Sequence, residues 1–439
     1  MKKLTAIVIG AGNRGSAYSK LMVAHPEMYE VVGVAEPIKV RNDNIKNMFN
    51  IPEENCYESW EQILDRPKFA DYAVIATQDA LHFAPAIKAL ELGYDLLLEK
   101  PMTPTPEESR MITETAERLG RKVVICHVLR YTKLYKGVKQ VLDSGRLGDV
   151  VSVQWLEPVG HKHMSHSFVR GKWCNKEQSA PMILAKSCHD LDAIQWLIGK
   201  KCEKLSSFGS LMYFRKENKP EGAPERCTDG CPHEATCPYD TKKLYLGERP
   251  WGSNWFRSTA TDKVEPTDEE VMDALLNTQY GKCVFDCNNN VVDHQVVNML
   301  FEGGTTVSMT MSGPSPDGAG RMFKFFCTKG TLEVGGNNNI ITITEFSKHE
   351  GPYLMNKVTE EIDVTRVEDS NGISLESGHG GGDGGIVGAI YEDFNGVYEG
   401  CSISTARDSY RNHLLSWAAE ESRLAGGKVI DMDEFAAQH

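Results

Sequence analysis

The sequence has no long apolar run, and basic residues are in the minority. A helix that spans a bilayer needs about 20 consecutive apolar residues, so we expect no membrane-spanning segment. Lys and Arg number 48 against 61 Asp and Glu, which gives a net charge of −13. Because such a surface repels phosphate backbones and anionic lipid headgroups, we expect neither nucleic acid nor a membrane as a partner.

Cysteine is also sparse, with twelve residues in a chain of 439. That number is too small for a disulfide framework and is typical of a reducing compartment. The chain opens with Met1-Lys2-Lys3 and a short apolar stretch, which continues into a glycine-rich turn instead of a small-residue cleavage site. We therefore interpret this stretch as a first strand and expect a cytoplasmic protein.

The length of the chain exceeds what a single hydrophobic core usually serves, which predicts two domains. We place the first domain at residues 1–125 and the second at residues 126–439. The second domain is expected to contain a cysteine-rich insertion around residues 220–290.

A glycine-rich turn joins the first predicted strand, residues 4–9, to a predicted helix at residues 16–24. In this context three glycines provide a tight turn, close approach of the backbone to a pyrophosphate, and close packing of helix on strand. The start of the helix offers free N–H groups to the phosphates. The pattern predicts a dinucleotide site that includes Gly10, Gly12, Asn13, Arg14 and Gly15.

An acidic residue follows where such a site needs one. The second predicted strand, residues 30–35, ends at Glu36, which lies 21 residues past Gly15. A carboxylate at this point binds the hydroxyls of the adenosine ribose. It repels the 2′-phosphate of NADP, which favours NAD, but Lys39 and Arg41 could neutralise that phosphate. We predict NAD as the cofactor and keep NADP as the alternative.

Lys100 stands at the carboxyl end of another predicted strand, residues 94–98, where open α/β sheets bind their ligands. Oxidation of a secondary alcohol needs a group that takes the hydroxyl proton while the hydride leaves. A surface lysine at a strand end is the alternative, but Pro101 fixes the backbone that follows and so aims this side chain. These features make Lys100 a candidate for this group.

These residues form part of a pattern that resembles a known family. Ala76-Thr77 with His82, then Glu99-Lys100-Pro101, then Arg130 and Gly145-Arg146-Leu147-Gly148 are similar to the Gfo/Idh/MocA oxidoreductases. The resemblance implies an α/β protein with an N-terminal Rossmann domain, which is a doubly wound parallel sheet. It also implies a C-terminal α/β domain with a large open, mainly antiparallel sheet, and a homodimer or homotetramer. It places Thr77, His82, Glu99 and Lys100 at the cofactor. It also implies that Lys100 contacts the reacting hydroxyl, so we predict that Lys100 is catalytic.

His189 is the second predicted catalytic residue. It shares a helical face with Asp192, and the segment resembles the family's region in which a histidine four residues after an aspartate acts as acid or base. Here Ala185 occupies the position of that aspartate. Lys186 could take over a polar role, or His189 could serve alone, since histidine titrates near neutral pH. A buried structural histidine is the alternative.

Further polar residues suit a sugar or polyol, whose hydroxyls need donors and acceptors. The segment of residues 157–173 is rich in histidine, and a metal site or an exposed loop are its alternatives. A glycine-rich loop at residues 378–385 resembles the His-Gly-Gly-x-Asp loop of the family's NAD-dependent glycosidases, and a surface linker is its alternative. The predicted substrate residues are Arg130, His161, His163, His166, Arg170, Trp173, Lys186, Asp192, His379 and Asp383.

Five cysteines gather in the insertion. Cys227, Cys231 and Cys237 have a C-x3-C-x5-C spacing, and Cys283 and Cys287 follow. Three or four thiolates can hold a structural zinc ion, for which we predict Cys227, Cys231, Cys237 and Cys283. Cys287 and His233 remain alternative fourth ligands. An iron–sulfur cluster or unligated thiols are the competing interpretations.

The sequence as a whole predicts an NAD(P)-dependent oxidoreductase that acts on a CH–OH group of a sugar, sugar acid or polyol. One alternative is a redox-neutral NAD-dependent glycosidase, in which oxidation, elimination and reduction follow one another. Another is a non-catalytic NAD-binding sensor. Only the first accumulates NADH.

Overall fold

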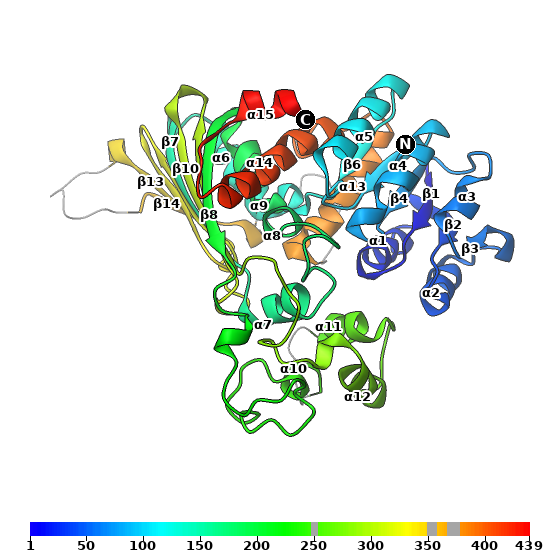
Figure 1. Cartoon of the computed structure of the whole chain (residues 1–439). Coiled ribbons are helices and arrows are strands. Elements are labelled where there is room, and N and C mark those ends of the chain that lie inside the picture. The colour runs from blue at the N-terminus through cyan, green and yellow to red at the C-terminus, as the bar shows by residue number, and fades with distance from the viewer. Residues whose placement is uncertain (247–252, 349–357, 367–377) are drawn as a thin grey trace.

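Two β-sheets with a layer of helices between them organise the molecule (Figure 1). The computed structural model describes residues 1–246, 253–348, 358–366 and 378–439. Within these ranges no helix combines the length and apolar character that a membrane span requires.

The N-terminal sheet has six parallel strands in the order β3-β2-β1-β4-β5-β6. This is the strand order of the dinucleotide-binding doubly wound fold, so the predicted Rossmann domain is confirmed. Helices cover both faces, which is why central strands such as β1 are almost entirely apolar. The strands are β1 (Leu4–Ile9), β2 (Tyr29–Ala35), β3 (Cys56–Tyr57), β4 (Tyr72–Ile75), β5 (Asp95–Leu98) and β6 (Val123–Ile125).

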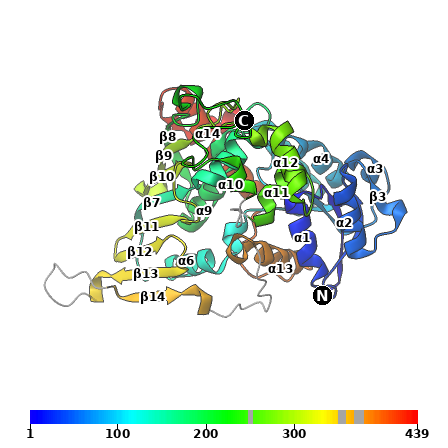
Figure 2. The same cartoon turned by 90° about the horizontal axis from the view of Figure 1, so that it is seen from below.

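Five helices of this domain follow its strands along the chain. A sixth helix on this sheet, α13 (Gly382–Phe394), comes from the far end of the sequence and lies beside α1 (Figure 2). The Tyr29 hydroxyl donates a hydrogen bond to the carbonyl of Val387, and Ile386 and Ile390 join the apolar core of the first domain. The preceding helices are α1 (Asn13–Val23), α2 (Lys39–Phe49), α3 (Trp60–Leu64), α4 (Phe83–Glu91) and α5 (Pro106–Leu119).

The second sheet has nine strands in the order β14-β13-β12-β11-β7-β10-β9-β8-β15. Every neighbouring pair is antiparallel except β7 and β10, so the predicted large, mainly antiparallel sheet is confirmed. The strands are β7 (Val150–Pro158), β8 (Cys202–Ser210), β9 (His294–Phe301), β10 (Thr306–Ser312), β11 (Met322–Cys327), β12 (Gly330–Gly335), β13 (Ile340–Glu345), β14 (Glu360–Asp363) and β15 (Ile430–Asp431).

Helices pack on one face of this sheet, and its strands alternate buried and more exposed residues. Val153 and Trp155 face the core, whereas Val151 on the same strand is 50% exposed and Phe208 on β8 is 58% exposed. The alternation is that of a sheet with one open face. The helices of this part are α6 (Lys133–Asp143), α7 (His161–His163), α8 (Met182–Ala185), α9 (Cys188–Ile198), α14 (Ala406–Leu424) and α15 (Met432–Gln438).

The predicted insertion lies between β8 and β9 and extends below the helical layer in Figure 1. It contains α10 (Thr241–Tyr245), α11 (Ser253–Thr261) and α12 (Asp268–Asn277). These helices enclose a small apolar cluster of their own, which includes Tyr245, Phe256 and Leu275. The insertion is therefore a packed subdomain and not an extended loop.

Candidate active site

The glycine turn lies at the carboxyl end of β1 and leads directly into α1. Gly10 has φ +89°, a left-handed conformation that favours glycine. A Cβ atom on Gly15 would lie 2.0 Å from the carbonyl oxygen of Gly10, whereas one on Gly12 would meet no atom within 4 Å. Gly12 caps α1 without a side-chain hydrogen bond, so the first N–H groups of the helix are available to an anion. The turn thus fits a dinucleotide pyrophosphate.

Glu36 lies next to this turn, as predicted for a carboxylate that binds ribose. Its Oε2 accepts a hydrogen bond from the backbone N–H of Ala11 at 2.7 Å, and its Oε1 accepts one from Ile38 at 3.0 Å. The two basic residues beyond it already have partners: Lys39 pairs with Asp43, and Arg41 pairs with Asp262.

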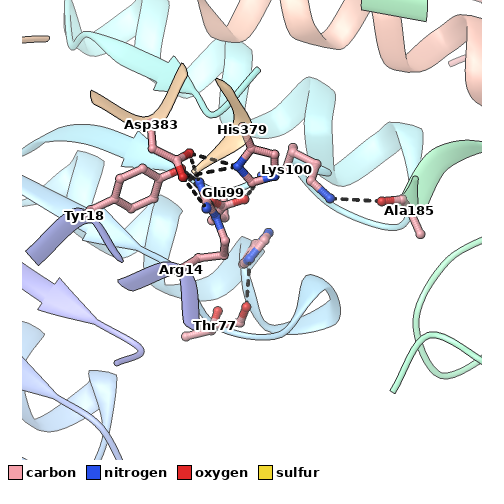
Figure 3. A network of polar contacts seen from close by, with 9 residues as sticks. Arg14, Tyr18, Thr77, Glu99, Lys100, Ala185, His379 and Asp383 are labelled. Atoms are coloured by element: carbon pink, nitrogen blue, oxygen red, sulfur yellow. Dashed lines mark hydrogen bonds and ion pairs between the residues drawn. The ribbon is translucent and has the colours of Figure 1, made fainter. Parts of the chain in front are cut away.

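Arg14 is the centre of a polar network that joins α1 to the start of α13 (Figure 3). Its guanidinium donates to Glu99 Oε1 at 2.7 Å and to both oxygens of Asp383, at 2.7 and 3.1 Å. The Tyr18 hydroxyl also donates to Glu99 at 2.7 Å. Burial favours the protonated form of Glu99, but the charges of Arg14 and Lys100 outweigh it and lower the pKa of this carboxyl. Glu99 therefore stays ionised and positions Arg14.

Lys100 reaches from the end of β5 to the second domain. Its Nζ donates to the carbonyl oxygen of Ala185 at 3.0 Å (Figure 3). Ala185 precedes His189 by four residues, so the backbone of the position that lacks an aspartate receives the Lys100 ammonium. The two residues predicted as catalytic thus meet where the two domains face each other.

His189 is buried in the first turn of α9, and its ring is 6.4 Å from that of His379 and 5.8 Å from that of His127. Burial, together with the positive charge of Lys100, lowers the pKa of His189 well below its usual value. The imidazole is therefore neutral at neutral pH and able to accept a proton. Nδ1 of His189 has no hydrogen-bond partner among the described residues.

The glycine-rich loop before α13 lies beside these residues. Nδ1 of His379 is 3.2 Å from both oxygens of Asp383, and the His379 side chain is 46% exposed. Burial raises the pKa of Asp383, but hydrogen bonds from His379 and Arg14 outweigh it and hold this pKa well below its usual value. Although His379 and Asp383 are distant from Lys100 in sequence, the fold brings all three together.

Thr77 and His82 follow β4 at the same edge of the sheet. The His82 ring joins two loops, with Nδ1 2.9 Å from the carbonyl oxygen of Pro101 and Nε2 3.3 Å from that of Thr77. His82 therefore holds the segment after Lys100 against the segment after β4. In the same loop, Asp79 accepts hydrogen bonds from Trp173 Nε1 and from Ser179, both at 3.0 Å, so Trp173 also spans the two domains.

Two more of the predicted substrate residues lie near Lys100. Burial, with the charges of Lys186 and Lys100, lowers the pKa of His163 well below its usual value, so its ring is neutral. Lys186 pairs with Glu157 at 3.1 Å. Glu157 and Asp190 both pair with Arg321, at 2.9 and 2.6 Å.

The other five predicted substrate residues have partners within the protein. Arg130 forms a two-point ion pair with Asp192 at 2.6 and 2.8 Å, and both side chains are buried. His161 pairs with Asp317 at 3.0 Å. His166 stacks on Phe256 inside the insertion, with ring centroids 3.9 Å apart. Arg170 is fully buried and donates to the carbonyl oxygens of Lys282 and Tyr239. Such contacts indicate structural roles for Arg130, Asp192, His166 and Arg170.

The predicted zinc site is not supported by the structure. The four cysteines line one cavity of about 20 Å³, but the described residues contain no group of three or more His, Cys, Asp or Glu side chains arranged to hold a metal. Burial raises the pKa of Cys237 and of Cys283, so these thiols stay protonated. The C-x3-C-x5-C spacing thus brings cysteines to one cavity without arranging their sulfur atoms as a metal site.

Sequence reasoning missed His127 and Arg321. Both ring nitrogens of His127 are buried without a hydrogen-bond partner among the described residues, and Nε2 is 3.8 Å from Asp192. Arg321 comes from the loop before β11 and pairs with Asp190, the neighbour of His189. Neither residue belongs to a local motif, so only their position in space connects them with the site.

The fold and this site define a two-domain oxidoreductase with an NAD-binding domain. A family model described as "Oxidoreductase family, NAD-binding Rossmann fold" matches residues 4–127, and the "GFO/IDH/MocA C-terminal domain" matches residues 135–226. The chain belongs to the Gfo/Idh/MocA oxidoreductase family, as the sequence motifs indicated.

Similar proteins include YteT of Bacillus subtilis, named as an oxidoreductase, which is 25% identical over 83% of this chain and 82% of its own. An inositol 2-dehydrogenase of Streptomyces avermitilis is 28% identical, over 50% of this chain and 59% of its own. An oxidoreductase from Agrobacterium radiobacter, solved with NAD+, L-tartaric acid and magnesium, has a TM-score of 0.68 at 13% identity, over 99% of both chains. This last likeness concerns the fold.

Proposed function

We propose that this protein is an NAD-dependent dehydrogenase that oxidises a secondary hydroxyl of a sugar, sugar acid or polyol. The observation that carries the proposal is the meeting of Lys100, from the sheet edge of the NAD-binding domain, with the segment that presents His189. A proton acceptor and an ammonium group beside a dinucleotide turn are what hydride transfer from an alcohol requires.

The division of work between the two residues follows from their charges. Bound NAD would supply the hydride acceptor. The neutral imidazole of His189 takes the proton of the substrate hydroxyl, while Lys100 donates a hydrogen bond to the same oxygen and stabilises the negative charge that develops there. The backbone carbonyl oxygen of Ala185 holds Lys100 until the substrate arrives.

The substrate class rests on the polar groups around this point and on the inositol dehydrogenases among the relatives. His163, Lys186 and His379 lie close to Lys100 or His189 and offer donors and acceptors to several hydroxyls. Trp173 provides an aromatic surface beside the same loops. We therefore favour a ring-shaped polyol or sugar.

A preference for NAD over NADP follows from the neighbours of Glu36. Its carboxylate repels a 2′-phosphate, and the cations that could offset this repulsion, Lys39 and Arg41, are engaged by Asp43 and Asp262.

The position of His379 favours a second candidate, the redox-neutral glycosidase. The His-Gly-Gly-x-Asp loop brings a second imidazole to within 6.4 Å of His189, between ring centroids. In such a reaction one carbon is oxidised, a neighbouring proton leaves, and the glycosidic bond breaks by elimination. Water then adds and the hydride returns to the sugar, so the cofactor ends unchanged. A second acid–base group would serve the elimination.

The first experiment offers NAD or NADP and a panel of sugars, uronic acids, inositols and aryl glycosides to the purified protein. We expect NADH to accumulate with at least one substrate, measured by its absorbance, and to disappear in Lys100→Ala. Release of the aglycone without accumulation of NADH would contradict the dehydrogenase assignment and favour the glycosidase. Tight binding of NAD with neither product would favour a sensor.

Two further properties form part of the proposal. The open face of the nine-stranded sheet, with Val151 and Phe208 exposed, suits an interface between copies of this chain. We expect light scattering of the purified protein to show a dimer or tetramer.

All twelve cysteines are free thiols, which suits a reducing compartment such as the cytoplasm.

A further inference from the structure

The insertion touches the dinucleotide-binding domain at two points that flank the proposed cofactor site. Nδ2 of Asn13, in the glycine turn, donates to Oγ1 of Thr259 on α11 at 2.8 Å. Nη2 of Arg41, on α2, donates to Oδ1 of Asp262 at 2.8 Å. Figure 2 shows α11 beside α1. The insertion therefore contacts the glycine turn and α2, which lie more than two hundred positions before it in the sequence.

Asp262 directly follows α11, and its carboxylate pairs with two cationic side chains. Its Oδ1 also accepts from Nζ of Lys172 at 3.1 Å, so one carboxylate oxygen serves Arg41 and Lys172. The Arg41 side chain is 15% exposed and the Asp262 side chain 47%, so a largely buried guanidinium pairs with a half-exposed carboxylate. The backbone of Asp262 has φ +57°, a conformation that aspartate tolerates better than most residues.

Arg41 stands where a 2′-phosphate would need a cation. It is the third residue of α2, which begins just after Glu36, and Glu36 is the carboxylate expected at the adenosine ribose. A guanidinium at this place would pair with a phosphate in two-point fashion if it were free. In this protein its partner is a carboxylate from the other domain.

We infer that Asp262 determines the choice of dinucleotide: by occupying Arg41 and Lys172, it removes the cations that would bind the 2′-phosphate of NADP. The inference rests on the proposed function, because it assumes a dinucleotide at the glycine turn. It assigns to the insertion a role at the cofactor, which the fold of the first domain alone does not provide.

The test measures dissociation constants of NAD and NADP by calorimetry, at low ionic strength, for the wild type, Asp262→Asn and Asp262→Ala. Both variants are expected to shift the ratio of the two constants toward NADP by about tenfold or more, equivalent to about 1.4 kcal/mol. Arg41→Met in the Asp262→Asn background should cancel most of this shift. Far-ultraviolet circular dichroism of each variant verifies the fold.

Asp268→Asn is the matched control. Asp268 pairs with Arg257 within the insertion, so this substitution also removes one negative charge, but away from Arg41. An equal shift in this control would overturn the inference, because the effect would then be one of net charge. An unchanged ratio in both Asp262 variants would also overturn it, while leaving NAD binding and the proposed function intact. Failure of the wild type to bind either dinucleotide would overturn the proposed function, and the inference with it.

Discussion

Gly12 and Gly15 stand three residues apart in one turn, yet the space around them differs. A Cβ on Gly15 would collide with the carbonyl oxygen of Gly10, so this glycine is required by the fold itself. A Cβ on Gly12 would meet no atom of the described residues within 4 Å, so none of them requires glycine there. The requirement at Gly12 can only come from a ligand that approaches the backbone.

Alanine at these two positions separates the two requirements. Gly15→Ala is expected to lower the free energy of unfolding by about 1–3 kcal/mol, since backbone must move to relieve the contact. Gly12→Ala should have the same urea midpoint of unfolding as the wild type but bind NAD at least about tenfold more weakly. Urea titration and calorimetry measure the two effects, and normal NAD binding by Gly12→Ala would contradict the proposed pyrophosphate position.

His189 and Lys100 are expected to act on the chemical step. His189→Asn and Lys100→Met should each lower kcat by roughly 10²–10⁴-fold, the usual contribution of a positioned proton-transfer group. The dissociation constant of NAD should change little in His189→Asn, since among the described residues His189 makes no direct hydrogen bond to the glycine turn and is connected to it only through His379 and Asp383. A kcat within a few-fold of wild type for His189→Asn would show that another group accepts the proton.

At the level of the elements, α13 packs against the first domain although it lies far from that domain in the sequence. Its side chains complete the apolar core around Tyr29 and Tyr72, and Asp383 in its first turn holds Arg14 of α1. The first domain therefore depends on a helix that the chain reaches only near its end. A boundary drawn at residue 125 by sequence continuity does not include this helix.

Asp383→Asn tests the connection between α1 and α13. The substitution removes the charge opposite Arg14 and is expected to lower the free energy of unfolding by about 1–3 kcal/mol, because the carboxylate is buried. Asp393→Asn is the control on the same helix, where the pair with Lys122 is more exposed and worth about 1 kcal/mol or less. Equal losses in urea titrations of the two variants would contradict the role given to Asp383.

At the scale of the whole molecule, five histidines enclosed by the fold make stability depend on pH. Burial is the largest cause that lowers the pKa of each, and for His413 the value falls to about 3. The histidines are His127, His163, His166, His189 and His413.

The sign follows from the protons that each state binds. Below about pH 6.5 the unfolded chain protonates these histidines while the folded protein does not, so stability falls as the pH falls toward the folded pKa values. Each contributes up to about 1.4 kcal/mol per pH unit in that window. Denaturant unfolding at pH 8, 7, 6 and 5 should show this decline, and His127→Leu should reduce its slope. A flat profile between pH 7 and 5 would contradict it.

Features with local causes could be predicted from residues that are neighbours in the chain. The glycine turn, Glu36 and the strand that delivers Lys100 depend on residues close together in the chain. Backbone conformation and hydrophobic periodicity follow from neighbouring residues, so these features could be predicted and the Rossmann sheet is as expected.

Packing between distant segments, by contrast, determines which polar side chains reach the site and which hold the fold together. Arg170 and His166 look like substrate ligands in sequence but are enclosed by the insertion, whereas His379 and Asp383 lie at the centre of the site. The cysteine spacing, likewise, does not specify how the sulfur atoms are arranged. Burial and ion pairing depend on segments hundreds of residues apart, and their packing is a property of the folded chain alone.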